Sequence, residues 1–515
     1  ADRSGAIAVD GTRLPLREKA PGRLTRDEAL LIAFRNSNEY QTRKEQLFAQ
    51  ALAVANGRRG WEAPLAAGEI SGFTGVDRIG DDKASFPTES DLKLGLTQQL
   101  AQGGVITMGL ALSAATDFLG GGDATAGSLL SAGITQPLLR GAGRGLAYEN
   151  QYRLERDFAI ALYDFARYEQ TFATDVTNRF YRLLQQRDLL ENEKASIQQS
   201  EVTYARTKAL FDRGQVSRIQ TDQAEQNLLD AQVRLERTRQ DYEDAVDAFK
   251  IFIALPVTAN VEPAYAEAMG QLRKLVPDAA DIPLTEPRAR EIAMQTRPDV
   301  LTQRAALRDA ERNVEIASDA FLPQLDVQAG VNVPSKPPRQ IHELQFHRSE
   351  RFAKIMFDYH FDQTDDRDAY RNSILALAKA QRDYEQFTDG VLLAVRRSFR
   401  ALEQSRRTYR LQSNSVQIAE RRYLLAAREQ SEGQAAARDV LEAEEALRTA
   451  RNGLTDALVE YATTRLDFLA TLGMLQVDAK GRIHERAEPV TFRRIAARYS
   501  YAPGPPGSVG RTEAR

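Results

Sequence analysis

The sequence predicts a mainly α-helical protein made of two tandem copies of one unit, in which long antiparallel helices are joined to a region of β-strands. Three observations lead to this fold class. Residues of the two halves match in register, very long stretches lack both glycine and proline, and the segments between them alternate between apolar and polar residues. Together they predict extended helical rods attached to a sheet rather than a compact globule.

The composition narrows the class of protein. Lys and Arg number 69 against 72 Asp and Glu, which leaves a net charge of −3 and predicts no nucleic-acid partner. The chain has no cysteine, so we expect neither disulfide bonds nor thiol catalysis nor an acylated N-terminal cysteine. A run of about 18 apolar residues is missing, which argues against a transmembrane helix. A membrane-crossing β-strand needs only about 10 residues of alternating character.

The first pattern along the chain is an internal repeat. Residues 24–61 match residues 284–321 at an offset of 260, and a later block matches at an offset of 219. The matched pairs include Leu24/Leu284, Ala29/Ala289, Val176/Val395, Phe180/Phe399, Tyr204/Tyr423, Gly214/Gly433, Tyr242/Tyr461 and Phe249/Phe468. Aromatic and glycine pairs held in register over this length predict two copies of one unit. The smaller second offset predicts an insertion in the first copy.

The uninterrupted stretches predict very long helices. In the first copy we expect helices over about 144–213 and 215–255, with Gly214 as the break between them. The second copy repeats the pattern over about 366–432 and 434–472. A helix over about 144–213 would be about 100 Å long at 1.5 Å per residue. Such rods are typical of a coiled coil, a solenoid or a tunnel wall, and a soluble coiled coil that spaces two partners is an alternative explanation.

The segments between the helices predict strands with one apolar and one polar face. In the second copy we expect strands at about 325–333 and 352–362, and in the first copy four strands within about 66–137. This alternation is what a water-filled transmembrane β-barrel requires, although a soluble sheet packed on a core shows it too. Because the flanking helices are too long and too polar to supply such a core, we favour the barrel.

The order of elements in both copies, the breaks at Gly214 and Gly433, and the residues Ile134-Thr135-Gln136-Pro137-Leu138-Leu139 resemble the TolC-like outer-membrane efflux protein family over about residues 24–474. The resemblance implies a homotrimer whose helical hairpins form an α-barrel tunnel, continued by an outer-membrane β-barrel. The implied parts are an N-terminal extended arm (1–23), a first repeat (24–255), an equatorial linker (256–283), a second repeat (284–474) and an equatorial tail that ends disordered (475–515).

The resemblance also implies where this chain would act. The helix-turn tips that receive a periplasmic adaptor protein would be Arg213-Gly214-Gln215 and Glu432-Gly433-Gln434. A periplasmic gate of acidic rings would consist of Asp439 and Glu442, which are three residues apart and so share one helix face. An acidic residue early in a helix also complements the helix dipole, which is the competing explanation. The chain departs from the family at Ala435 and Gln220, so Arg438 is a further candidate for holding the closed state.

No residue pattern predicts catalysis or a bound cofactor. His342, His347 and His360 lie within 19 residues, but their spacing fits no common metal motif, and a surface loop or a pore-facing position explains them. We therefore expect no enzyme activity, no cofactor and no metal site.

The leading hypothesis is a passive, water-filled exit duct in the outer membrane of a Gram-negative-type bacterium, extending into the periplasm and gated at its periplasmic tip. Its partners would be outer-membrane lipid, a periplasmic adaptor and an inner-membrane pump or secretion ATPase. The cargo could be a drug, a metal ion or a protein. The alternatives are a soluble periplasmic coiled-coil scaffold and a secreted enzyme with an unrecognised site.

Overall fold

The computed structural model describes residues 22–62, 65–74, 77–78, 84–85, 87–117, 125–275, 284–336, 340–432, 434–478 and 482–486. The chain divides into two compact units. The first unit comprises residues 1–45, 163–301 and 387–500, and the second unit comprises residues 46–162, 302–386 and 501–515. Each unit contains parts of both repeats. No helix among the described residues is both long enough and apolar enough to cross a membrane.

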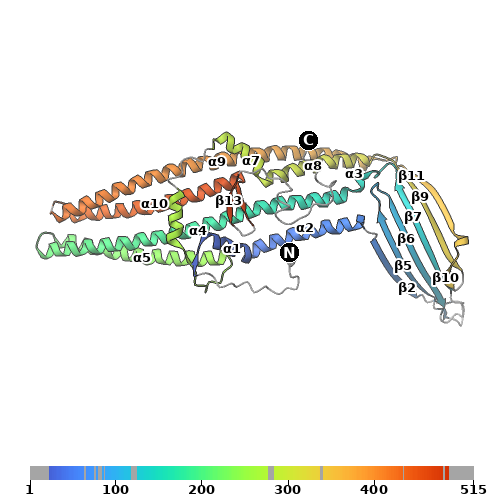
Figure 1. The fold of residues 1–515 in the computed structure, drawn as a ribbon, viewed down its shortest axis with the longest axis horizontal. Helices are drawn as coiled ribbons and strands as arrows, with labels where there is room; N and C mark the ends of the chain where they lie inside the picture. Colours follow the sequence, from blue (N-terminus) through green and yellow to red (C-terminus); the bar gives the residue numbers. More distant parts are fainter. Residues whose placement is uncertain are drawn as a thin grey trace. The chain divides into compact units, whose positions relative to one another are not determined.

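The helices follow the predicted order, with four long ones near the predicted positions (Figure 1). They are α1 (Arg26–Asn36), α2 (Asn38–Glu62), α3 (Arg144–Ala147), α4 (Glu149–Asp212), α5 (Arg218–Phe252), α6 (Tyr265–Leu275), α7 (Glu286–Thr296), α8 (Pro298–Asp319), α9 (Thr364–Ser431) and α10 (Ala437–Leu472). The helix predicted from 144 is interrupted at Tyr148, and the helix predicted over 215–255 begins later because Ser217 caps α5.

The second unit contains one antiparallel sheet in which six long strands run in the order β11-β9-β7-β6-β5-β2. They are β2 (Leu65–Thr74), β5 (Pro87–Gln99), β6 (Val105–Asp117), β7 (Thr125–Pro137), β9 (Gln324–Lys336) and β11 (Glu350–Asp358). The short strand β10 (Gln340–Leu344) also pairs with β9, and β3 (Asp77–Arg78) pairs with β4 (Ala84–Ser85). All four long strands of the first repeat therefore belong to the same sheet as the hairpin of the second.

Local chemistry accounts for the ends of two strands. β5 and β6 are joined by a tight turn in which Gly103 has φ +90, a conformation that glycine adopts without strain. The strand predicted over about 352–362 corresponds to β11, which ends earlier, at Asp358. The Asp362 carboxylate accepts a hydrogen bond from the Thr364 amide at 3.0 Å, which starts α9 instead, so His360 lies outside the strand.

In the first unit, the two repeats build matching apolar cores. One core contains Ala29 and Ala33 of α1, Val176 of α4 and Phe249 and Ile253 of α5. The corresponding residues of the second repeat form the other core, namely Ala289, Ala293, Val395, Phe468 and Leu472. Residues matched along the sequence thus occupy corresponding places in the structure.

The segments before, between and after the repeats also pack in this unit. β1 (Arg23–Leu24) pairs in parallel with β8 (Glu262–Pro263), and Met269 and Leu272 of α6 are buried in the first core. After α10, β12 (Leu475–Val477) pairs with β13 (Ile483–Glu485), so the first part of the predicted tail is ordered. The end of this tail, which was predicted to be disordered, lies outside the described residues.

Candidate functional site

The six long strands of the sheet form two chemically different faces. Because directly opposed residues of neighbouring strands point to the same side, the pairing register assigns every residue to a face. One side, here called the apolar face, carries Ile70, Leu92, Leu94, Leu96, Ile106, Met108, Leu110, Leu112, Leu130, Ile134, Leu325, Val327, Val331, Val333, Ile355 and Phe357. Apolar residues thus dominate this side on all six strands.

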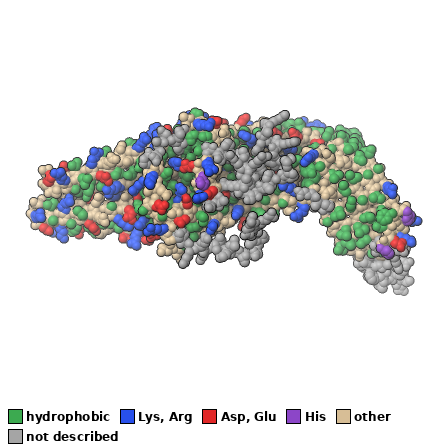
Figure 2. All heavy atoms as spheres, viewed as in Figure 1, with side chains coloured by type: hydrophobic (Ala, Val, Ile, Leu, Met, Phe, Trp, Pro, Cys, Tyr) green, Lys and Arg blue, Asp and Glu red, His purple; other side chains and the backbone are tan. Residues whose placement is uncertain are grey.

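Much of the apolar face is exposed. Ile70 is 85% exposed, Ile355 72%, Phe357 65% and Met108 52%. Figure 2 shows hydrophobic side chains gathered over the strands with few charged ones among them. A contiguous exposed apolar surface of this extent marks contact with lipid or with another protein.

The opposite side, the polar face, is suited to water. Glu69 lies directly opposite Lys93, and Asp91 and Glu89 follow along β5. On the other strands the polar face carries Thr107, Ser131, Thr135, Asp326, Gln328, Asn332 and Lys354. The two outermost long strands, β2 and β11, are exposed along their described length. Their outer edges can therefore pair with further strands.

In the first unit the long helices lie in the order α9, α10, α4, α5 (Figure 1), and α10 runs antiparallel along α4. Besides the apolar residues that α4 and α10 share in the first core, a row of polar contacts joins the two repeats along this α4–α10 seam. They are Asn178–Asp467 at 2.9 Å, Gln185–Asp456 at 2.7 Å, Asn192–Asn452 at 3.0 Å, Arg448–Glu193 at 3.0 Å and Ser200–Glu444 at 2.5 Å. Nothing in the sequence pattern distinguishes these polar side chains from those that face water.

The first tip is a glycine-ended helix. Gly214 has φ +71, and the Gln215 amide donates to the Leu210 carbonyl at 2.9 Å, which closes the last turn of α4. A Cβ added at Gly214 would meet nothing within 4 Å, so only the backbone conformation demands glycine. Arg213, Gly214 and Gln215 are all exposed.

The second tip has the same closing contact. The Gln434 amide donates to the Glu429 carbonyl at 2.9 Å, at the position that corresponds to Gln215 and Leu210 in the first repeat. Glu432 and Gln434 are exposed, and the Glu432 carboxylate forms an ion pair with Arg428 at 3.0 Å. Gly433 lies outside the described residues.

The predicted gate residues are both exposed at the start of α10, and each has a partner in its own chain. The Asp439 carboxylate accepts a hydrogen bond from the Ala436 amide at 3.1 Å and so caps the helix. Glu442 pairs with Arg438 at 2.9 Å. An exposed ion pair of this kind stabilises a helix by only about 0.3–0.5 kcal/mol, so Glu442 can easily leave Arg438 for another partner.

Two groups of exposed apolar residues were not predicted. Phe211 and Ile219 flank the first tip and are 39% and 69% exposed. On α9, Leu411, Ile418 and Leu425 form a stripe with a spacing of seven residues, and each is at least 59% exposed. A heptad spacing on an exposed face is the signal that could have found this stripe, because it indicates packing against another helix.

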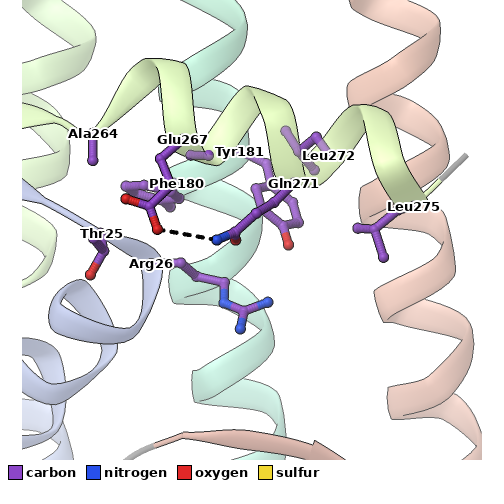
Figure 3. A pocket seen from close by; sticks show the side chains of 10 residues that line it. Thr25, Arg26, Phe180, Tyr181, Ala264, Glu267, Gln271, Leu272 and Leu275 are labelled. Carbon is purple, nitrogen blue, oxygen red and sulfur yellow. Dashed lines mark hydrogen bonds between the residues drawn. The ribbon is translucent and has the colours of Figure 1, made fainter.

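The three histidines and the pocket beside α6 are further places at which a ligand could bind. His342, His347 and His360 are exposed, and the described residues contain no group of three or more side chains able to hold a metal ion. A pocket of about 120 Å³ lies between Arg26, Phe180, Tyr181 and α6 (Figure 3). Arg26 pairs with Asp27 at 2.9 Å and Gln271 donates to Glu267 at 3.4 Å, so these polar groups already have partners.

Solved structures of outer-membrane channels have the same fold. The Campylobacter jejuni CmeC outer membrane channel matches with a TM-score of 0.62 at 14% identity, over 94% of this chain and 94% of that one. VceC from Vibrio cholerae matches with a TM-score of 0.62 at 13% identity, over 87% and 96% of the two chains. The open state of the Neisseria gonorrhoeae MtrE channel matches with a TM-score of 0.61 at 14% identity, over 87% and 88%.

The sequence itself gives a match in the second half of the chain. Residues 289–474 match the family model described as outer membrane efflux protein. Among curated proteins none matches this sequence. The resemblance indicated by the sequence is therefore confirmed: residues 289–474 match the outer membrane efflux protein family, and the chain has the fold of TolC-like outer-membrane channels.

Proposed function

We propose that this protein is the outer-membrane exit duct of a tripartite efflux or secretion system, a passive water-filled channel rather than an enzyme. The observation that carries the proposal is the exposed apolar face across all six long strands, with a polar face behind it. In a membrane-spanning barrel the apolar face would contact outer-membrane lipid and the polar face would line water. A soluble scaffold would gain nothing from such a surface.

The functional assembly we propose is a homotrimer. One chain offers six long strands with two free edges, too few to enclose a water-filled pore. Three copies would supply about 18 strands, a number at which barrels leave an aqueous channel. In the view of Figure 1, α9 and α5 are the outermost of the four long helices, and in the proposed trimer α9 of one copy would meet α5 of the next.

The charges on these two helices support that pairing. From residue 391 to 431, α9 has nine Arg and three Glu, whereas α5 has eight Asp or Glu and five Arg or Lys. The exposed stripe of Leu411, Ile418 and Leu425 would then pack beside Leu229 and Val233, which are exposed on α5. Opposite net charges favour this pairing over α9 meeting α9.

The tips are the proposed docking site of a periplasmic adaptor, which would connect the duct to an inner-membrane pump or secretion ATPase. Arg213, Gly214 and Gln215 are exposed, and Phe211 and Ile219 add apolar surface beside them. Apolar residues surrounded by polar ones are typical of protein–protein interfaces.

The tip turn gives one prediction. We expect Gly214→Val to reduce export while the trimer remains in the membrane, because a β-branched residue resists the positive φ that shapes the tip. The measurement is pump-dependent efflux together with trimer abundance. Gly270→Val in α6, where glycine is not in a positive-φ conformation, is the control. Equal loss of trimer and efflux would leave docking at this tip without support.

Ion conduction and cation preference test the proposed channel and its gate of Asp439 and Glu442. The reconstituted protein is expected to conduct ions in planar bilayers and to prefer cations, because Asp439 and Glu442 would surround the threefold axis. Asp439→Ala with Glu442→Ala should reduce this preference several-fold. Arg438→Ala should raise it, because Glu442 loses its partner at 2.9 Å.

Each result has a clear contrary outcome. A folded protein that never inserts or conducts would refute the channel. Unchanged selectivity in the double variant would remove Asp439 and Glu442 from the gate but leave the duct intact.

A further inference from the structure

The buried side of α4 changes character towards the tip. In its middle it is apolar and aromatic, with Phe172, Val176, Phe180 and Leu184 in the first core. From residue 193 onward the same side consists of Glu193, Ser196, Ser200, Thr203 and Thr207, none more than 4% exposed. Their spacing of three and four residues keeps them on one helix face. Near the tip, therefore, α4 is held by hydrogen bonds more than by hydrophobic contact.

Glu444 of α10 lies against this polar stretch. It is 3% exposed, and its carboxylate accepts hydrogen bonds from Ser200 at 2.5 Å and from Thr203 at 3.4 Å. The Asn227 amide of α5 donates to Ser200 at 3.4 Å. In the described part of the chain, no Lys or Arg nitrogen lies within 4.0 Å of the Glu444 carboxylate. Among the described residues, the close donors to this carboxylate are the neutral hydroxyl groups of Ser200 and Thr203.

Another buried carboxylate of the same seam shows the contrast. Glu193 is equally buried, but Arg448 lies 3.0 Å from it and Arg234 lies 3.6 Å from it. A buried carboxylate paired with arginine keeps its charge, whereas one with only neutral donors is stabilised by binding a proton.

The charged and titratable groups around Glu444 come from three helices. Burial raises the pKa of Glu444, the hydrogen bonds from Ser200 and Thr203 and the more distant Arg234 of α5 lower it, and Glu445 of α10 raises it, with a net increase. From α9, Tyr423 faces the same site, and burial and the Glu444 charge raise the pKa of its hydroxyl. Tyr423 therefore stays neutral while Glu444 titrates.

We propose that Glu444 is a proton-responsive latch that fastens α10 to α4 near the tips, closed when its carboxyl is protonated and loosened when it is ionised. The protonated carboxyl is neutral and both donates and accepts hydrogen bonds, so the seam stays dry. The ionised carboxylate has no close cation and draws water between the helices. The latch would set how readily the two repeats separate at their tip ends.

The direction of the pH effect follows from the raised pKa. A carboxyl that binds its proton more tightly in the folded bundle than in the unfolded chain stabilises the bundle fully below the unfolded pKa of about 4.3. This stabilisation is lost as the pH rises through the higher folded pKa. Mild acid should therefore close the seam, and neutral pH should loosen it.

Hydrogen exchange of the full-length protein in detergent tests the latch. The protection of amides in 196–212 and 437–450 should fall between mild acid and neutral pH, after correction for the intrinsic effect of pH on exchange. The expected loss is about tenfold for each unit by which the pKa of Glu444 is higher in the folded bundle than in the unfolded chain. Glu444→Gln should keep the high protection of acid conditions at every pH. Glu225→Gln is the matched control, because Glu225 is the corresponding residue of the first repeat and is exposed.

A second variant covers the case in which Glu444→Gln fails to fold. Ser200→Ala removes one donor to the carboxylate, so the pH at which protection falls should move upward. The proposal is overturned if wild-type protection does not depend on pH, if Glu444→Gln retains the dependence, or if Glu225→Gln abolishes it. It is also overturned if Ser200→Ala leaves the midpoint unchanged. The proposal rests on the helical bundle and not on the proposed channel, because hydrogen exchange measures opening of the seam and not ion flow.

Discussion

Arginine in place of Met108 is expected to remove most of the assembled trimer from the outer membrane. Met108 lies on the apolar face of β6, opposite Leu96 and Ala132, and is 52% exposed. An arginine on the lipid side of a barrel costs about 2–4 kcal/mol near the bilayer midplane, and a trimer would carry three. The measurement is the amount of heat-modifiable, detergent-extracted trimer in outer-membrane fractions.

The neighbouring residue provides the control. Thr107 is on the same strand and is also exposed, but it belongs to the polar face, opposite Gly133 and Thr97. Thr107→Arg should therefore insert normally and change only the conductance. If both variants insert equally well, the apolar face does not contact lipid and the duct proposal loses its main support.

Glutamate in place of Leu411, Ile418 and Leu425 should give the second large effect, conversion of the trimer to monomer. These residues form the exposed stripe on α9, and burying each against a neighbouring copy would contribute about 1.5–3 kcal/mol. The substitutions would also place negative charge against acidic α5. Analytical ultracentrifugation in detergent measures the result.

A single-residue comparison separates this interface from general damage to the helix. Ile418→Glu should weaken the trimer, whereas Gln417→Glu, an exposed position about 100° around the helix, should have a much smaller effect. Trimer stability that is unaffected by the triple variant would show that α9 does not form the subunit interface.

The candidate site was predictable from the sequence where local patterns carry the information. The sequence predicts a helix break at Gly214 because this residue separates two long helices, and its positive φ explains the residue type. The family resemblance, through the distance from Gly433, indicates Asp439 and Glu442 as gate residues, and the structure has both at the start of α10. Their partners could not be predicted, because the Ala436 amide and Arg438 compete for them through local geometry.

The polar seam between α4 and α10 lay beyond sequence reasoning. On helices rich in charge, a serine or glutamate facing a neighbouring helix looks like one facing water, so nothing marked Ser200 or Glu444 as buried. Periodicity identifies which residues share a face, but not which neighbour covers that face.

By itself the sequence determined the two repeats, the long helices, the alternating strands and the glycine breaks, because hydrophobic period and glycine content act within a few residues. Tertiary structure alone decided that the extra hairpin of the first repeat joins the common sheet, that matched residues build two separate cores, and that Glu444 is buried between the repeats. These outcomes depend on contacts between residues that are far apart in the sequence, such as Ser200 and Glu444, and such pairing is set by the packing of whole helices and strands rather than by local preference.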